Sequence, residues 1–187
     1  MMLQLEDDAP APDVLFHFGL RVREKYRSAP RFLVDRPAVK ASPNVTRARS
    51  QGRVRLASAD FRDKPVIDLN YFSDPYDLRL LLKAMRFTRG LLQTRSLQKV
   101  CKAELRPGPE VETDDEWVNY IRQVCETVYH PCGTAAIGRV VTPDLKVKGI
   151  VNLFIADASV FPAMITVNIN CAVMMVAEKA AELIAAG

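Results

Sequence analysis

The stretch TDDEWVNYIRQVCETVYHPCGT, residues 113–134, combines a helix start, an amphipathic helix and a tight loop. Thr113 and Glu116 have the spacing of a capping box, in which the threonine oxygen accepts from an early helix amide and the glutamate folds back to the cap. One face of the following helix is apolar at three- and four-residue spacing, at Trp117, Ile121, Val124 and Val128. The stretch therefore predicts a helix that begins after Thr113 and reaches about Val128.

A histidine follows this helix directly. Pro131 disfavours helical geometry at His130, and Gly133 permits a tight turn two residues further on. The imidazole is therefore expected on a stiff loop. A lone histidine is more often a hydrogen-bonded core or surface group than a catalytic base, so the loop alone does not decide between these two interpretations.

Outward from this stretch, the chain alternates between strand formers and helix signals. Short runs rich in strand formers predict strands at residues 14–18, 32–40, 50–56, 65–68 and 151–156. Residues 43–46, Pro-Asn-Val-Thr, are expected to form a loop. The pair Asp74-Pro75 predicts the start of a helix that runs to about Thr94. A last helix, residues 170–185, is apolar on every side and is expected to be buried. This order of elements predicts an α+β fold with a mixed or antiparallel sheet and packed helices.

The composition is that of an ordinary globular chain and excludes several functional classes. Of the 187 residues, 49% are apolar and 26% are charged. The net charge is +4, but the bases alternate with acids and no aromatic and basic stripe accompanies them, so nucleic-acid binding is not expected. No apolar run is long enough for a transmembrane segment. No signal peptide is seen after Met1, which predicts a cytoplasmic protein unless the N-terminus is truncated.

The cysteines and histidines have no metal-site spacing. Cys101, Cys125, Cys132 and Cys171 form neither a Cys-x-x-Cys pair nor a disulfide framework, which is typical of reduced thiols. The two histidines, His17 and His130, lie more than a hundred residues apart, so no metal site is expected. Cys132 lies beside His130, but a two-residue separation on a proline-containing loop seldom brings a thiol and an imidazole face to face.

A second group of polar residues precedes the last helix. Asp157 follows the predicted strand 151–156, and Asn168 and Asn170 stand at the helix start. Asparagines at a buried helix start are unfavourable unless they are hydrogen-bonded. The simpler interpretation is that one asparagine caps the helix and that Asp157 forms a turn.

Taken together, these segments resemble the C-terminal domain of the glucose-methanol-choline (GMC) flavin oxidoreductases. The characteristic order is Tyr-His-Pro-Cys-Gly-Thr at 129–134, a glycine at 138, then residues 145–153, 156–159, 168–170 and 177–181. Upstream, residues 52–60 and 65–72 also resemble that domain, so the resemblance extends from about Val14 to the end. Two departures are Ile137, where the family often has methionine, and residues 164–167, where glycine or serine is common. These leave the alcohol undetermined. The choice between oxidase and dehydrogenase also stays open, because it depends on cavities that a sequence does not show.

The resemblance implies an FAD-dependent enzyme that oxidises an alcohol by hydride transfer to the flavin. His130 would be the catalytic base and Asn170 would position the substrate oxygen. The implied cofactor-binding residues are Tyr129, His130, Asp157, Ala158, Asn170 and Ala172. The N-terminus of the last helix would favour the anionic reduced flavin.

The resemblance also implies a division of the chain and a missing part. Residues 1–13 would be a lead-in or truncated linker, residues 14–128 a substrate-binding region, and residues 129–187 a catalytic and flavin-contacting region. No Gly-x-Gly-x-x-Gly is present, so the FAD-binding Rossmann unit is expected elsewhere, in the same or another chain. The isolated chain is then expected to be inactive. The alternative is a non-catalytic fragment or subunit that associates with a separate flavin-binding partner, and a homo-oligomer is left open.

Overall fold

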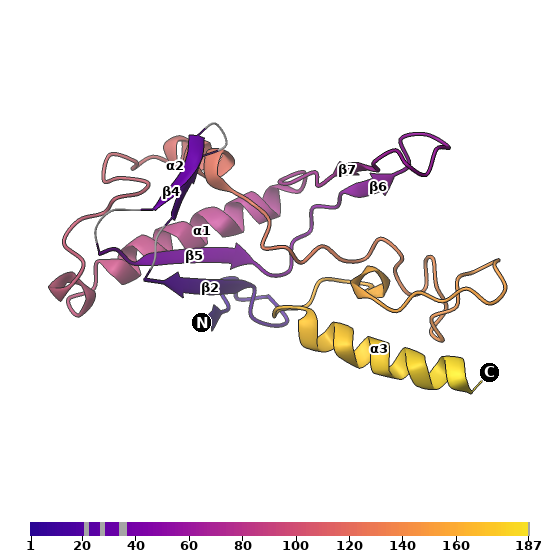
Figure 1. Ribbon diagram of the computed structural model, residues 1–187. Coiled ribbons are helices and arrows are strands. Elements are labelled where there is room, and N and C mark those ends of the chain that lie inside the picture. Colours follow the sequence, from indigo (N-terminus) through magenta and orange to yellow (C-terminus); the bar gives the residue numbers. More distant parts are fainter. Residues whose placement is uncertain (21–22, 27–28, 34–36, 187) are drawn as a thin grey trace. The chain divides into compact units, whose positions relative to one another are not determined.

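A computed structural model describes residues 1–20, 23–26, 29–33 and 37–186 of the protein (Figure 1). The chain forms two compact units, each built from two separate stretches of sequence. The first unit contains Met1–Val45 and Asp74–Val128, and the second contains Thr46–Ser73 and Tyr129–Gly187. The sequence-based division and the two units share the boundary after Val128. They differ at residues 46–73, which belong with the C-terminal stretch.

The first unit contains a three-stranded antiparallel sheet, in the order β1 (Met2–Leu3), β2 (Val14–Gly19) and β5 (Lys40–Val45). The strand predicted at 14–18 is therefore present. The loop predicted at 43–46 is wrong, because Pro43 lies in β5 opposite Phe16. An edge strand tolerates a proline, since one side of it has no hydrogen-bonding neighbour.

A separate antiparallel hairpin joins β3 (Arg23–Tyr26) to β4 (Ala29–Leu33). The single strand predicted at 32–40 is not present as such. Its first residues end β4, residue 40 begins β5, and residues 34–36 lie outside the described part of the chain. A run of strand formers does not by itself show where one strand stops and the next begins.

The N-terminal residues are part of the first unit rather than a loose lead-in. Residues Met2 and Leu3 pair with β2, and Asp13 is fully buried. Its carboxylate accepts hydrogen bonds from the amides of Leu5 and Glu6, at 2.8 and 2.9 Å. A buried carboxylate is stable only when it is paired in this way.

Helix α1 (Pro75–Leu92) packs on this sheet. The Asp74 side chain accepts from the Tyr76 amide at 2.9 Å, and Pro75 occupies the first turn, as the sequence predicts. The helix ends two residues before the expected Thr94. A hydrophobic core forms where the helix meets the sheet, from Val14, Phe16, Tyr76, Leu80 and Ala84.

Helix α2 (Asp114–Val124) has the predicted capping box. The Glu116 amide donates to Thr113 Oγ1 at 3.3 Å, and the Thr113 amide donates to Glu116 Oε2 at 2.9 Å. The helix ends at Val124, so the extension to Val128 is wrong. Arg89 of α1 stacks on the Trp117 ring at 4.2 Å and pairs with Glu104 at 2.8 Å. This arginine links α1 to α2 and to the intervening segment, which contains the short helix η1 (Leu97–Lys99).

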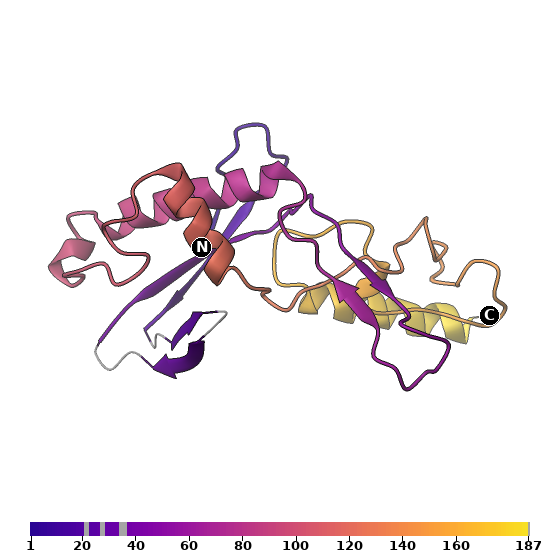
Figure 2. The ribbon, with the colours of Figure 1, turned by 90° about the horizontal axis from the view of Figure 1, so that it is seen from above.

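The second unit contains one hairpin, one short helix, one long helix and extended loops. The hairpin joins β6 (Arg53–Arg55) to β7 (Val66–Asp68), at two of the positions where strands are predicted (Figure 2). The strand predicted at 151–156 is absent, since that segment forms only an isolated bridge between Lys146 and Phe154. The short helix is η2 (Ala158–Val160).

Helix α3 (Asn170–Ala185) has the predicted bounds but not the predicted burial. Only Ala180 is buried, whereas Met174 and Met175 are more than half exposed. One side of α3 packs on a core formed by Val141, Leu145, Val160, Phe161 and Ile169. The sheets are antiparallel and α1 packs on one of them, so the predicted α+β class is confirmed.

Candidate active site

The loop that carries His130 has an unusual backbone conformation. Tyr129, directly before it, has φ of 66°, in the left-handed region that few residues other than glycine adopt. Gly133 has φ of 84°, and a Cβ at this position would lie 3.2 Å from the Phe161 carbonyl oxygen. The predicted tight turn at Gly133 is therefore present. His130, which lies between these two residues in the sequence, is half-buried.

Three hydrogen bonds fix the segment after His130 to the short helix η2. The amide of Gly133 donates to the Ala158 carbonyl at 3.2 Å, and the amide of Ala135 donates to the Ser159 carbonyl at 2.8 Å. A third bond, at 2.9 Å, joins the Ile137 amide to the Val160 carbonyl. The His130 loop and the Asp157 segment, 27 residues apart in sequence, are therefore neighbours in the fold.

Asp157 caps η2. Its Oδ1 accepts from the Ser159 amide at 2.8 Å. Hydrogen bonds from the Ser159 hydroxyl and the Ser159 amide hold the pKa of Asp157 below its usual value, because they stabilise the ionised carboxylate. The turn-forming role that the sequence suggests for Asp157 is therefore present. The capped turn also fixes Ala158, whose carbonyl accepts from the Gly133 amide.

The start of α3 has no side-chain cap. The N-cap residue is Ile169, and neither Asn168 nor Asn170 caps the helix. Both asparagines are exposed, so the expectation of a buried helix start is wrong. Among the described residues, the side-chain nitrogen of Asn170, Nδ2, contacts only the sulfur of Met174, at 3.8 Å. Because sulfur is a weak acceptor, the polar atoms of Asn170 remain available for another group.

Backbone amides at the same helix start are also unpaired. Within the described ranges, the amides of Asn170, Cys171 and Ala172 have no acceptor, and the first bond of the helix is from Val173 to Ile169, at 2.9 Å. Unpaired amides at a helix N-terminus carry a partial positive charge. They suit a group that offers hydrogen-bond acceptors or negative charge.

Packing connects the residues around this site. Cys132 Sγ lies 3.9 Å from Met164 Sδ, and both side chains pack against the core of the second unit. Ala158 and Ala172 pack against the same core. Burial raises the pKa of the Cys132 thiol, which disfavours a thiolate nucleophile and agrees with the sequence argument against that role. The contact with Met164 has no signal in the sequence, because no spacing rule joins residues 132 and 164.

All six predicted site residues therefore lie in the second unit, on the His130 loop, at η2 and in the first turn of α3. Of the two histidines, His17 has a structural role, since its Nδ1 lies 2.8 Å from the Asn44 side-chain nitrogen across β2 and β5. No cluster of three or more histidine, cysteine, aspartate or glutamate residues suited to a metal ion occurs in the part of the chain that the structure describes. No helix among the described residues is long and apolar enough to cross a membrane.

Comparison with known sequences gives the family. The sequence model described as GMC oxidoreductase matches residues 48–177, which include the hairpin, the His130 loop, η2 and the start of α3. The chain belongs to the GMC oxidoreductase family. Choline oxidase of Arthrobacter globiformis is 41% identical over 187 residues, a match that covers 96% of this chain and 34% of the relative.

Solved structures of other GMC oxidoreductases have the same fold. Pyridoxine 4-oxidase from Mesorbium loti matches with a TM-score of 0.82 and 26% identity, over 91% of this chain and 34% of that chain. Formate oxidase of Aspergillus oryzae RIB40, in a variant made to study FAD modification, matches with a TM-score of 0.79 and 28% identity. The match covers 95% of this chain and 32% of that chain. This GMC chain therefore spans about a third of the length of the relatives it matches.

Proposed function

We propose that this chain is the catalytic C-terminal part of an FAD-dependent enzyme that oxidises an alcohol. The family match carries the proposal, because it extends across both the His130 loop and the start of α3. FAD, when bound, would supply the hydride acceptor. The protein residues must then remove the hydroxyl proton and hold the alcohol in a reactive orientation.

His130 would act as the base. A neutral imidazole within hydrogen-bond reach of the substrate hydroxyl accepts its proton as the C–H bond is broken. The loop supports this role because hydrogen bonds donated by the Gly133 and Ala135 amides anchor it, and because His130 is half-buried rather than fully solvated. A base on an anchored loop loses little orientation freedom during the reaction.

Asn170 would hold the substrate oxygen. Its side chain offers both a donor and an acceptor, and it is used neither as a helix cap nor in a strong hydrogen bond within the described chain. A polar side chain that contributes little to the fold is available to bind a substrate. Its role would be positioning rather than proton transfer, since an amide does not titrate.

The residues also fit the flavin. The unpaired backbone amides of residues 170–172 suit an acceptor-rich ring edge. Tyr129 and Ala172 would lie near the same ring. Asp157 is ionised and exposed, so it would accept from the ribityl hydroxyls rather than lie against the anionic pyrophosphate. Ala158, fixed by the capped turn, would contact the same part of the cofactor.

The alternative is that the chain is a subunit or fragment that has no activity until it associates with a separate flavin-binding partner. The chain spans 34% of choline oxidase and 34% of pyridoxine 4-oxidase, which both proposals accommodate. Both readings predict that the 187-residue chain alone is colourless and does not oxidise alcohols.

The test is to co-express the chain with the flavin-binding part of a relative, such as choline oxidase, and to follow flavin absorbance under anaerobic conditions. A panel of choline, benzylic, aliphatic and sugar alcohols is added to the purified complex. We expect bleaching by at least one alcohol, slowed several-fold when the carbon bearing the hydroxyl carries deuterium. A complex that retains FAD but is reduced by none of these classes would contradict the assignment.

A further inference from the structure

Helix α3 has three faces with different surroundings. One face packs on the core of the second unit, through Ala172, Val173, Val176, Ala180 and Leu183. A second face is charged, since Lys179 Nζ pairs with Glu182 Oε2 at 2.8 Å. Met175, four residues before Lys179, lies on this charged face. The third face is exposed and has no charge, and it is the one that lacks an evident role.

We call this third face the α3 stripe. Its residues are three or four positions apart, which places them on one side of the helix: Asn170, Met174, Ala177, Ala181 and Ile184. The contact of Asn170 Nδ2 with Met174 Sδ, at 3.8 Å, agrees with this alignment. Met174 is 60% exposed and Ile184 is 51% exposed, and both alanines are exposed. The stripe is therefore an apolar surface about 21 Å long that begins at Asn170.

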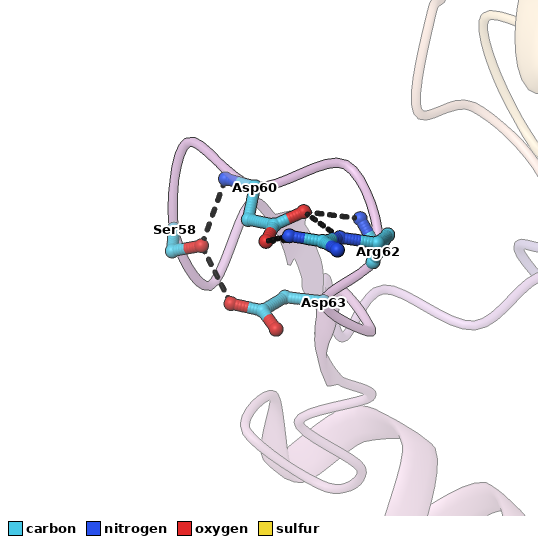
Figure 3. Close-up of polar contacts among 4 residues, drawn as sticks. All are labelled: Ser58, Asp60, Arg62 and Asp63. Carbon is cyan, nitrogen blue, oxygen red and sulfur yellow. Dashed lines mark hydrogen bonds and ion pairs between the residues drawn. The ribbon is translucent and has the colours of Figure 1, made fainter.

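The loop of the β6–β7 hairpin also exposes an apolar ring, Phe61, but in a polar setting (Figure 3). The Arg62 guanidinium donates to the Asp60 carboxylate through Nε at 2.9 Å and through Nη2 at 2.6 Å. The Ser58 hydroxyl donates to Asp63 Oδ2 at 2.6 Å. An exposed ring between the two members of an ion pair does not by itself indicate a partner. A continuous apolar stripe on a helix does, because such a face is ordinarily buried.

The position of Asn170 indicates which partner covers the stripe. Under the proposed function, on which this inference rests, Asn170 holds the substrate oxygen beside FAD. Because Asn170 begins the stripe, the polypeptide that holds FAD at this position approaches the same face of α3. The match covers 34% of choline oxidase, so most of that relative lies outside it. A second copy of the chain would cover Asn170 without supplying the Gly-x-Gly-x-x-Gly that binds a dinucleotide, which the 187 residues lack.

We propose that the α3 stripe is the surface on which the FAD-binding part of the enzyme docks. Met174 and Ile184 become buried in this contact, and the removal of their apolar surface from water stabilises it. The two alanines between them allow the partner to approach the helix closely. The charged face of α3, with Met175, stays in contact with water.

A charge placed on the stripe tests the docking. The chain is co-expressed with the flavin-binding part of choline oxidase, and association is measured by sedimentation velocity with detection at the flavin absorbance. Ala181→Glu keeps a good helix former but buries a carboxylate in the contact, so we expect at least tenfold weaker association. Met175→Glu is the matched control, because Met175 is 66% exposed on the charged face and its replacement should change little. Far-ultraviolet circular dichroism shows whether each variant remains folded.

Cysteine labelling in the complex maps the contact without adding a charge. Ala177→Cys should react with a maleimide at least tenfold more slowly than Met175→Cys, because only the stripe is covered. Tandem mass spectrometry identifies the labelled residue and separates it from Cys171, which is exposed in the same helix.

Assembly is measured without an alcohol, so the two proposals fail separately. A complex that forms through the stripe but is reduced by no alcohol would contradict the proposed function and leave the docking surface in place. Association unaffected by Ala181→Glu, or equal labelling of the two cysteine variants, would overturn the docking surface. The absence of a wild-type complex would also overturn it, as would self-association of the chain that is lost in Ala181→Glu.

Discussion

At the scale of single residues, the His130 loop depends on backbone conformations that side chains usually avoid. Tyr129 has φ of 66° and Gly133 has φ of 84°, on either side of the histidine and Pro131. Left-handed residues often occur at functional sites, where the surrounding structure holds them in place. Here the hydrogen bond from the Gly133 amide to the Ala158 carbonyl contributes to that support.

Replacement of Gly133 by alanine should therefore destabilise the chain. The new Cβ would be strained at this φ and would lie 3.2 Å from the Phe161 oxygen, so we expect a loss of about 1–2 kcal/mol in the free energy of unfolding. Gly90→Ala is the matched control, because Gly90 lies inside α1 with no atom near its Cβ position. That change should stabilise by roughly 0.5–1 kcal/mol. Urea unfolding measures the free energy of unfolding of both variants. Equal stability of Gly133→Ala and wild type would show that the left-handed conformation at Gly133 does not require glycine.

The hydrogen bonds to Asp157 predict a pH effect. Because the folded-state pKa is depressed, the stability from this carboxylate is present above its unfolded pKa and is lost as the pH falls through the folded pKa. Ser159→Ala removes the hydroxyl bond, the larger cause, and should raise the pKa of Asp157 toward its ordinary value. Carbon-13 NMR titration of the carboxyl group measures this. An unchanged Asp157 pKa in Ser159→Ala would show that the hydroxyl does not stabilise the carboxylate.

At the scale of elements, local signals predicted helix starts well and chain pairing poorly. Asp74-Pro75 and the Thr113 capping box identify the starts of α1 and α2, because a cap acts over a few adjacent residues. The strand at 151–156 and the loop at 43–46 were wrong for the opposite reason. A strand requires a partner from elsewhere in the chain, and β5 finds one in β2.

The capping box of α2 should contribute measurably to stability. Thr113→Ala removes the acceptor of the Glu116 amide, and we expect a loss of about 1 kcal/mol by urea unfolding. Ser96→Ala is the control, because Ser96 precedes η1 without a side-chain cap bond and should cost little. Similar losses in the two variants would show that the box does not stabilise α2.

Asn170 should affect function without affecting stability. Asn170→Ala removes no cap hydrogen bond from α3, so the free energy of unfolding should change by less than about 0.5 kcal/mol. Flavin reduction in the complemented enzyme should slow, with weaker substrate binding. Asn44→Ala provides the contrast, since Asn44 bonds the Leu15 and Ser42 carbonyls at 3.1 and 3.0 Å and its loss should destabilise the first unit. A large stability loss in Asn170→Ala would assign Asn170 a structural role instead.

At the scale of the whole molecule, the sequence predicted the family and the α+β class, but not the two-unit division; the site residues stay a prediction. Motifs such as residues 129–134 and 168–170 are local and can be read directly from the sequence. The grouping of 46–73 with 129–187, the Cys132–Met164 contact and the one-sided packing of α3 result from long-range packing, which no local pattern encodes. Burial of α3 was overestimated because an all-apolar helix indicates that other residues pack against it, but the sequence does not show which residues these are.

We propose His130 as the base of an alcohol-oxidising flavin enzyme. The most direct measurement is the anaerobic rate of flavin reduction in the complemented enzyme, compared between wild type, His130→Ala and the control His17→Ala, with bound FAD checked by absorbance in each. We predict a loss of roughly 10²- to 10⁴-fold in His130→Ala and little change in His17→Ala. Undiminished reduction in His130→Ala, with FAD bound, would contradict the claim.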